Sequence, residues 1–269
     1  MSVASTLRGR RRTPGVRRTR RRRMTPALPL TTLARSTTPP SRCGYLPAER
    51  SSVAYRVLVD VTAAQHEALL ARGWRRFGCE WFRPVCLACT ACRSLRIPLA
   101  TFTPSRSQRR ALRGNATVQV VMQAPTITGA HLRLYNAYHA AMQRQKGWPW
   151  HPIDPVEYVQ SYLGGDWPFA REFLYFEQGR LVGVGLADIT PTALSSVYFF
   201  HEPAWRPRAP GVYSILQQLA YAQRHGLRYH YLGYWIAGCP SMAYKGQYRP
   251  HELLVGSPPD DVEPTWIAG

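Results

Sequence analysis

Three cysteines form the most conspicuous chemical group in this chain. Cys86, Cys89 and Cys92 stand three positions apart in the segment FRPVCLACTACRSLRIP. Thiolates at this spacing are typical of zinc and iron–sulfur sites, and a closed zinc site needs four ligands. The other cysteines offer a fourth ligand: Cys43, Cys79 and Cys239. A redox-sensing group, or three thiols packed beneath a pocket, has the same spacing, so all three interpretations stay open.

Four arginines follow in PSRSQRRALRGN (residues 104–115), a segment without acids. Ser105 or Ser107 is suited to begin a helix there, and Gly114-Asn115 to end it. At helical spacing the arginines share one face: Arg106, Arg109, Arg110 and Arg113. A stripe of one sign suits the phosphates of a nucleic acid, and a solvated helix face is the alternative.

Lysine is rare in this chain, because Lys146 and Lys245 are the only two among 35 basic residues. Where arginine is the usual cation, a lysine offers a compact charge beside an oxyanion or a phosphate. Lys245 lies in YLGYWIAGCPSMAYKGQYRP (residues 231–250). Three of the four tyrosines of this segment are candidates to stack on an adenine or bond a ribose, and ordinary sheet packing is the alternative. They are Tyr234, Tyr244 and Tyr248.

The chain lacks the residue patterns of covalent catalysis. It contains neither a Ser-His-Asp order nor a Gly-x-Ser-x-Gly turn. His201 and His251 are isolated, and we expect packing or surface roles for both. A reaction that depends on positioning two substrates fits such a sequence better than one with a covalent intermediate.

Composition places the protein among basic, globular chains. Its 269 residues are 45% apolar, and the net charge is +20. Twelve arginines precede residue 43 with no acid among them, which leaves +8 for the remainder. A basic body favours a polyanionic partner, with nucleic acid first. We expect no membrane partner, because no apolar run of about 18 residues occurs, and a cytoplasmic monomer with reduced thiols.

Strands and helices alternate after a polar start. We expect a disordered basic extension over residues 1–41. A strand is predicted over 52–60, a helix between the cap Thr62 and Gly73, a hairpin over 74–85, and strands over 93–100 and 116–124. These elements form a predicted N-terminal, cysteine-containing domain over residues 42–125.

A second unit is predicted over residues 126–256, with a loose tail over 257–269. It begins with helices over 128–145 and 154–163, the latter with Asp154 as cap. A strand hairpin follows over 171–190 and a strand over 195–203. A helix over 211–226 and strands over 227–236 and 247–256 complete it. This α+β order fits an acetyltransferase-like (GNAT-type) acyltransferase domain, in which a substrate carbonyl sits against exposed backbone donors.

Several of these segments together resemble the aminoacyl-tRNA–protein transferases. That family includes the bacterial aspartate/glutamate leucyltransferases and the eukaryotic arginyltransferases. The likeness runs from Cys43 to Leu254. Its matching residues are Cys43 and Tyr45; Arg83, Pro84, Cys86, Cys89 and Cys92; Pro104, Ser105, Arg106, Arg109, Arg110 and Asn115; Leu232 to Ile236; and Met242, Tyr244 and Lys245. The chain departs from the family pattern at Ser241, at Ala209-Pro210-Gly211 and in QRQKGWPWHP after Tyr138.

The resemblance implies an activity and its substrates. Such an enzyme moves an amino acid from aminoacyl-tRNA to a protein's N-terminal Asp or Glu and marks that protein for degradation. The ester is already activated, so the chemistry requires no cofactor. Lys245 and Tyr244 are then the expected catalytic residues, and Arg83 or Arg96 is expected to bind the carboxylate of the acceptor. Eukaryotic relatives have been linked to an iron–sulfur cluster through N-terminal cysteines. Cys43 is therefore the preferred candidate for the fourth ligand of a zinc or iron–sulfur site, beside Cys86, Cys89 and Cys92.

Two alternatives remain at this point. One is a tRNA-binding relative without transfer activity, and the other a transferase that acts on a small-molecule or cell-wall amine. Among transferases, leucine is favoured over arginine as the donor amino acid. An arginyl pocket needs a carboxylate, and Asp188, on a predicted central strand, is the acid that can line such a pocket.

Overall fold

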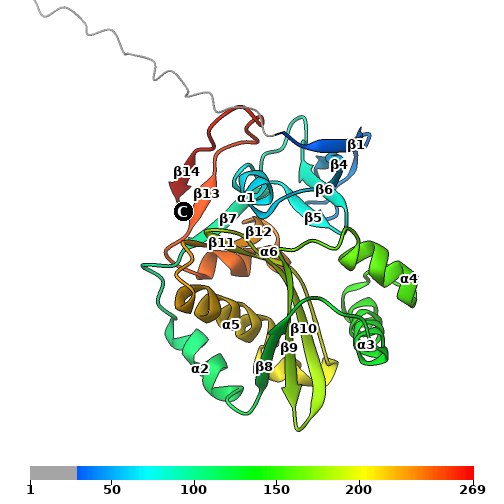
Figure 1. The fold of residues 1–269 in the computed structure, drawn as a ribbon, viewed down its shortest axis with the longest axis vertical. Helices are drawn as coiled ribbons and strands as arrows, with labels where there is room; N and C mark the ends of the chain where they lie inside the picture. Colours follow the sequence, from blue (N-terminus) through cyan, green and yellow to red (C-terminus); the bar gives the residue numbers. More distant parts are fainter. Residues whose placement is uncertain (1–28) are drawn as a thin grey trace, which may run out of the picture.

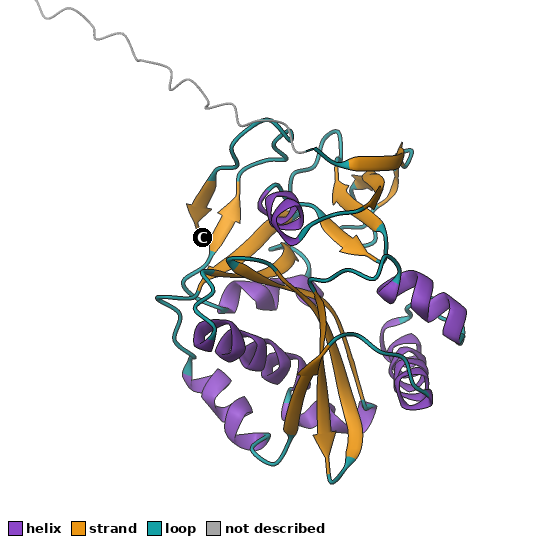
Figure 2. Cartoon of the chain, in the orientation of Figure 1, coloured by secondary structure: helices purple, strands orange, loops and turns teal. Residues whose placement is uncertain are grey.

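The computed structural model describes residues 29–269, and these form a mixed helix-and-strand fold, as predicted (Figures 1 and 2). The large sheet has eight strands in the order β14-β13-β7-β12-β11-β10-β9-β8, and a smaller sheet has the order β1-β4-β6-β5. The large-sheet strands are β7 (Arg93–Pro98), β8 (Gln119–Gln123), β9 (Ala170–Glu177), β10 (Arg180–Ile189), β11 (Ala193–His201), β12 (Tyr229–Trp235), β13 (Glu252–Leu254) and β14 (Trp266–Ala268). Those of the smaller sheet are β1 (Thr31–Thr37), β4 (Val53–Val59), β5 (Arg75–Phe77) and β6 (Glu80–Pro84), and β2 (Ser41–Arg42) pairs with β3 (Arg50–Ser51).

Helices cover both faces of the large sheet (Figure 1). On one face lie α5 (Pro210–Arg224) and α2 (Arg106–Gly114), over a core that includes Phe173, Leu216 and Leu219. On the other lie α3 (Gly129–Lys146), α4 (Pro155–Tyr158) and the π-helix η1 (Val159–Leu163). The remaining helices are α1 (Ala63–Ala71), η2 (Pro203–Arg208), α6 (Pro240–Ala243) and η3 (Tyr244–Gln247). None of the helices within residues 29–269 has the length and apolar character needed to span a bilayer.

Local capping signals account for where the helices begin. Thr62 accepts from the Gln65 N–H, and the Gln65 side chain accepts from the Thr62 N–H, which closes a capping box on α1. Ser105 begins α2 in the same way with Gln108, so Ser105 and not Ser107 is the cap. These reciprocal bonds satisfy backbone donors that the first turn of a helix leaves free.

Both ends of the described chain contain strands where we expected loose structure. The basic extension expected over 1–41 lies outside the described residues up to 28, but β1 occupies Thr31–Thr37 and pairs antiparallel with β4. The side chains of β1 are mostly exposed, so the strand is held by backbone hydrogen bonds to β4. Its sequence therefore has no apolar pattern from which a strand could be predicted. The loose tail expected over 257–269 contains β14, which pairs with β13, and Trp266 donates from Nε1 to the Ala71 carbonyl.

The predicted division at residue 125 does not separate the two sheets. β7 lies between β12 and β13, and β8 pairs with β9, so two strands of the predicted first domain belong to the large sheet. The smaller sheet with α1 encloses its own core, which includes Leu58, Trp74 and Trp81. The strands of the smaller sheet therefore all precede residue 85, and those of the large sheet all follow residue 92.

Neighbouring strands β11 and β12 diverge after a short parallel pairing. Ala193, Leu194 and Ser195 pair with residues 229–231, and from Ser196 onward β11 has no partner in β12. β12 instead continues against β7 as far as Trp235. The α5 helix connects the two strands, which is the predicted helix after the central strands. The divergence leaves main-chain groups of two central strands facing each other without mutual hydrogen bonds.

A buried charge network joins the two sheets. Asp188 on β10 accepts hydrogen bonds from the guanidinium of Arg76 on β5 and, at 2.8 Å, from His66 Nε2. Trp81 donates from Nε1 to His66 Nδ1 at 3.1 Å, so a neutral His66 has its proton on Nε2. Burial favours a protonated Asp188, but the charge and hydrogen bonds of Arg76 and His66 outweigh it and hold the pKa of Asp188 at about 2. The Asp188 carboxylate is therefore ionised, and both of its oxygens accept hydrogen bonds from Arg76 or His66.

We expect Asp188→Asn to lower the free energy of unfolding by about 3–5 kcal/mol, because Arg76 loses its buried anion. Urea unfolding at pH 7 measures the change. The matched control is Glu202→Gln, which removes a partly exposed pair with Arg180 at 3.8 Å and is expected to cost less than about 1 kcal/mol. In the native protein the Asp188 contribution is complete above its unfolded pKa near 4 and is lost as pH falls toward 2. A cost below about 1 kcal/mol for Asp188→Asn would contradict this role.

Candidate active site

Arg75 occupies the divergence of β11 and β12. Its Nη2 donates to the main-chain carbonyl of Ser196 on β11 at 2.7 Å. On the other side lies Gly233 of β12, where an added Cβ would stand 3.5 Å from Nε and Nη2. The guanidinium therefore lies between the two strands. Arg75 is only 7% exposed, and its Nη1 has no hydrogen-bond partner among the described residues.

Lys245 approaches the same position from η3. Its Nζ donates to the main-chain carbonyl of Tyr234 at 2.8 Å and lies 3.7 Å from the Cβ position of Gly233. The two cationic groups are thus within about 7 Å of each other. Gly233 has a φ of +79°, which favours glycine, and a Cβ added there would be in van der Waals contact with both cations.

The electrostatics of this pair are unbalanced. Within residues 29–269, no ion pair connects a carboxylate to Arg75 or Lys245, and the nearby Asp188 is bound to Arg76 and His66. Burial, with repulsion from Arg75, lowers the pKa of Lys245 to about 7. At neutral pH, Lys245 is therefore present in both its charged and its neutral form.

An aromatic wall borders the two cations. Phe77 is two residues after Arg75 on β5, which puts both on the same side of the strand, and it is 37% exposed. Its ring contacts Tyr162 and Tyr198 edge-on, at centroid distances of 5.8 and 6.1 Å. Tyr162 and Tyr198 are themselves stacked at 5.4 Å. This wall is apolar and holds no carboxylate.

Three residues predicted to bind substrate are engaged elsewhere. Arg96 pairs with Glu252 at 2.6 Å and lies over the Tyr229 ring, away from the cation pair. Arg83 lies over Trp74 and donates to the Pro258 carbonyl at 2.8 Å. Asp188 does not line a pocket, because the network between the sheets encloses it. Arg96 and Asp188 have charged partners within the protein, whereas Arg83 has main-chain carbonyls and a buried Nε that has no partner among the described residues.

The three predicted tyrosines differ in availability. Tyr244, next to Lys245, is 39% exposed and free to meet a ligand. The Tyr234 hydroxyl is shared between the carbonyls of Gly73 and Phe82, at 2.7 and 3.1 Å, and so ties β12 to the smaller sheet. Tyr248 is 1% exposed in the main core beside Phe102, which excludes it as a stacking surface for a base.

The arginine stripe forms as a helix face on α2. All four side chains predicted to contact tRNA are exposed: Arg106, Arg109, Arg110 and Arg113. The opposite side of α2 is fixed by buried Gln108 and by packing on α5. The helix therefore presents a basic surface on the α5 side of the large sheet.

The cysteines lie close to one another. Burial raises the pKa of Cys92 to about 12, with further contributions from four neighbouring thiols. These neighbours are Cys86, Cys43, Cys89 and Cys239. In the described part of the chain, no group of three or more His, Cys, Asp or Glu side chains is arranged to hold a metal ion. The donors predicted for zinc or iron–sulfur thus do not fit such a group here.

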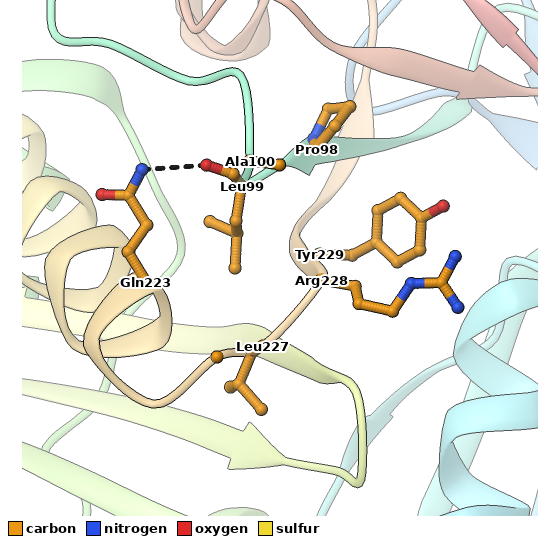
Figure 3. A pocket seen from close by; sticks show the side chains of 8 residues that line it. Pro98, Leu99, Ala100, Gln223, Leu227, Arg228 and Tyr229 are labelled. Carbon is orange, nitrogen blue, oxygen red and sulfur yellow. Dashed lines mark hydrogen bonds between the residues drawn. The ribbon is translucent and has the colours of Figure 1, made fainter.

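A cavity of about 610 Å³ lies apart from the cation pair (Figure 3). Pro98, Leu99 and Leu227 line it, and Gln223 closes one side by donating to the Leu99 carbonyl at 2.9 Å. The cavity adjoins Tyr229 at the start of β12, whereas Lys245 contacts Tyr234 near its end. It contains no group suited to acyl transfer.

The sequence pointed to Lys245 and Tyr244, whose catalytic roles stay predictions, and no motif indicated Arg75 or Ser196. Arg75 and Arg76 stand together in the apolar segment WRRF. Two adjacent charges in such a strand are a signal of buried arginines, each of which needs an anion or a carbonyl. The signal identifies the pair, but which arginine meets Asp188 depends on the arrangement of the sheets.

Comparison with known proteins gives consistent matches. Residues 41–110 and 130–255 match the family models described as arginine-tRNA-protein transferase, N terminus and C terminus. The chain is 38% identical over 224 residues to an aspartate/glutamate leucyltransferase of Helicobacter hepaticus, covering 83% of this chain and 93% of that protein. It is 39% identical over 219 residues to one of Pseudomonas aeruginosa strain LESB58, covering 81% and 92%. Among solved structures, FemX is similar at a TM-score of 0.40 and 10% identity, covering 76% of this chain and 79% of that one.

The lowered pKa of Lys245 predicts its reactivity. An amine-acylating reagent should label Lys245 half-maximally near pH 7, because only the neutral amine reacts. Mass spectrometry can follow Lys245 individually, since the only other lysine is Lys146. In Arg75→Gln the repulsion is gone, and we expect the midpoint to move to higher pH. A wild-type midpoint above about pH 9 would contradict the environment described.

Proposed function

Because the chain belongs to the arginine-tRNA-protein transferase family, we propose that it transfers leucine from a charged tRNA to the N-terminal aspartate or glutamate of a protein. The observation that carries this function is the extent of the match. Relatives named aspartate/glutamate leucyltransferase are 35–39% identical and align over 80% or more of the chain. The protein is therefore an aminoacyltransferase, and its two substrates are an aminoacyl-tRNA and a protein N-terminus.

Leucine is favoured over arginine by the site as well. The acid that we had expected to hold an arginyl side chain, Asp188, is ionised and bound to Arg76 and His66. The surface next to the cation pair is aromatic, and a guanidinium would meet Arg75 and Lys245 with a like charge. A leucyl side chain can pack against Phe77 and Tyr198 without such repulsion.

The reaction needs a neutral amine, an activated carbonyl and a route for one proton. The α-amine of the acceptor attacks the ester carbonyl, a C–N bond forms, the C–O bond to the ribose breaks, and the ribose oxygen leaves as a hydroxyl. No nucleophile of the protein is required. Holding the amine beside the ester can supply most of the acceleration, because it replaces an encounter between two molecules by one fixed geometry.

We assign the proton transfer to Lys245. The acceptor ammonium first loses one proton to solvent. The pKa of about 7 makes the neutral form of Lys245 available near neutral pH, so Nζ can then accept the proton that the attacking amine loses as the C–N bond forms and pass it to the leaving ribose oxygen. Lys245 is only partly buried, and Tyr244 beside it is exposed, so a substrate can reach both. The diverging main chains of β11 and β12 supply a place where a carbonyl can meet unpaired backbone donors.

Assays with Leu-tRNA and Arg-tRNA on one Asp-initiated peptide test the donor amino acid. We expect leucine to be transferred faster, with a ratio of at least about tenfold, because the site offers no carboxylate to a guanidinium. Faster transfer of arginine would contradict the assignment. Retained tRNA binding with transfer of neither amino acid would identify the chain as a non-catalytic relative instead.

We propose that the α2 stripe binds tRNA phosphates. Arg106→Glu/Arg109→Glu should weaken tRNA binding and make the affinity less dependent on salt, since each lost phosphate contact lowers the slope by about 0.7–0.9. The matched control is Arg133→Glu/Arg144→Glu, which reverses two exposed charges on α3. Equal effects of the two double variants would show that overall charge, and not the stripe, governs binding.

A further inference from the structure

We propose that a cysteine-lined cavity at the edge of the large sheet binds an apolar side chain of the acceptor protein, a few residues after its N-terminal Asp or Glu. The identity of that ligand rests on the proposed function, which requires a protein N-terminus as acceptor. The cavity measures about 640 Å³, and its lining includes Cys86, Cys89 and Cys92. The proposed transfer chemistry uses none of these residues.

The first argument is the apolar character of the cavity. Besides the cysteines, its lining contains five apolar residues: Pro84, Val85, Leu254, Val255 and Ile267. Val255 and Ile267 are each 45% exposed, and Leu87, in the cysteine loop, is fully exposed. The cysteines form no disulfide, and a free thiol packs as a small apolar group. Exposed apolar side chains gathered at one cavity indicate a site for an apolar ligand.

The second argument is the position of the cavity relative to Lys245. Arg93 lines the cavity at the start of β7, and it lies directly opposite Trp235 of β12 in the large sheet. Trp235 follows Tyr234, whose carbonyl accepts the hydrogen bond from Lys245 Nζ. Opposite residues of an antiparallel pair are about 5 Å apart, and each residue of an extended peptide spans about 3.4 Å. An acceptor whose amine is at Lys245 can therefore reach the cavity with a side chain about two to four residues further on.

The third argument is the charge of the wall. Among the residues that line the cavity, Arg93 is the only one with a basic or acidic side chain. None of the ion pairs within residues 29–269 includes it. A guanidinium without a carboxylate partner favours a nearby acid and repels a basic side chain. An apolar residue close to the acid at the acceptor's first position therefore matches this wall, and a lysine at the same place does not.

Cysteine labelling tests binding at the cavity without depending on transfer. Wild type is treated with a maleimide in the presence of Asp-initiated Gly/Ser peptides that carry one Leu, Ala or Lys at the third, fourth or fifth position. We expect the best Leu peptide to slow the labelling of Cys86 and Cys89 at least about threefold, the Ala peptide to slow it less, and the Lys peptide to leave it unchanged. Cys79 does not line the cavity, so it is the internal control and should keep its rate.

Transfer kinetics of two wall variants provide the second measurement. In Val255→Ser and Ile267→Ser we expect KM for the Leu peptide to rise at least about fivefold with little change in kcat, because only an apolar contact to the bound acceptor is lost. KM for the Ala peptide should change less than about twofold. The matched control is Val121→Ser, which truncates an equally exposed valine on β8 at the other edge of the sheet and should leave both KM values unchanged.

The outcomes separate this proposal from the proposed function. Equal protection of the cysteines by the Leu and Ala peptides, or KM values for the Leu peptide that neither wall variant changes, would overturn the cavity as an acceptor site. Labelling that slows with protein concentration in the absence of peptide would overturn it too, and would assign the cavity to an interface between two copies of this chain. A wild type that transfers no amino acid, but whose cysteines the Leu peptide protects, would support the cavity and contradict the transferase. Transfer that is indifferent to the residues after the acid, without protection, would do the reverse.

Discussion

The buried contact between Arg76 and Asp188 is the constraint on which the rest of this structure depends. It fixes the short strand β5 of the smaller sheet against β10 of the large one. Neighbouring side chains on a strand point to opposite sides, so anchoring Arg76 directs Arg75 away from Asp188 and into the divergence of β11 and β12. One ion pair therefore determines which of two adjacent arginines has an acid partner and which has a single main-chain carbonyl.

The site itself combines two things that a protein interior normally avoids. Two central strands separate, so their facing main-chain groups do not pair with each other, and two cations lie there with no carboxylate partner among the described residues. Each is unfavourable in isolation. The absence of a nucleophile in the sequence agrees with a catalyst that works by arranging its two substrates.

Local features were predictable from the sequence, and long-range pairings were not. Thr62, Ser105 and Asp154 were found as caps because a cap and its partners lie within a few residues. Arg96 was assigned to substrate because nothing local indicates Glu252 as its partner. Lys245 was found through rarity and family resemblance, but its neighbour Arg75 lies far away in sequence. β1 was missed because it pairs through its backbone and most of its side chains are exposed to solvent, so its sequence lacks an apolar pattern.

The position of β7 affects how the protein is made on the ribosome. β7 is flanked by β12 and β13, so its apolar Leu95 and Ile97 emerge long before their partners. The chain from Pro98 to Tyr229 must be synthesised first, which takes on the order of 10 s at about 5–20 residues per second. During that interval the nascent chain has an unpaired strand edge and an incomplete large sheet. The smaller sheet and α1, all earlier in the chain, can form meanwhile, and a stalled or truncated product would leave the strand available to chaperones and proteases.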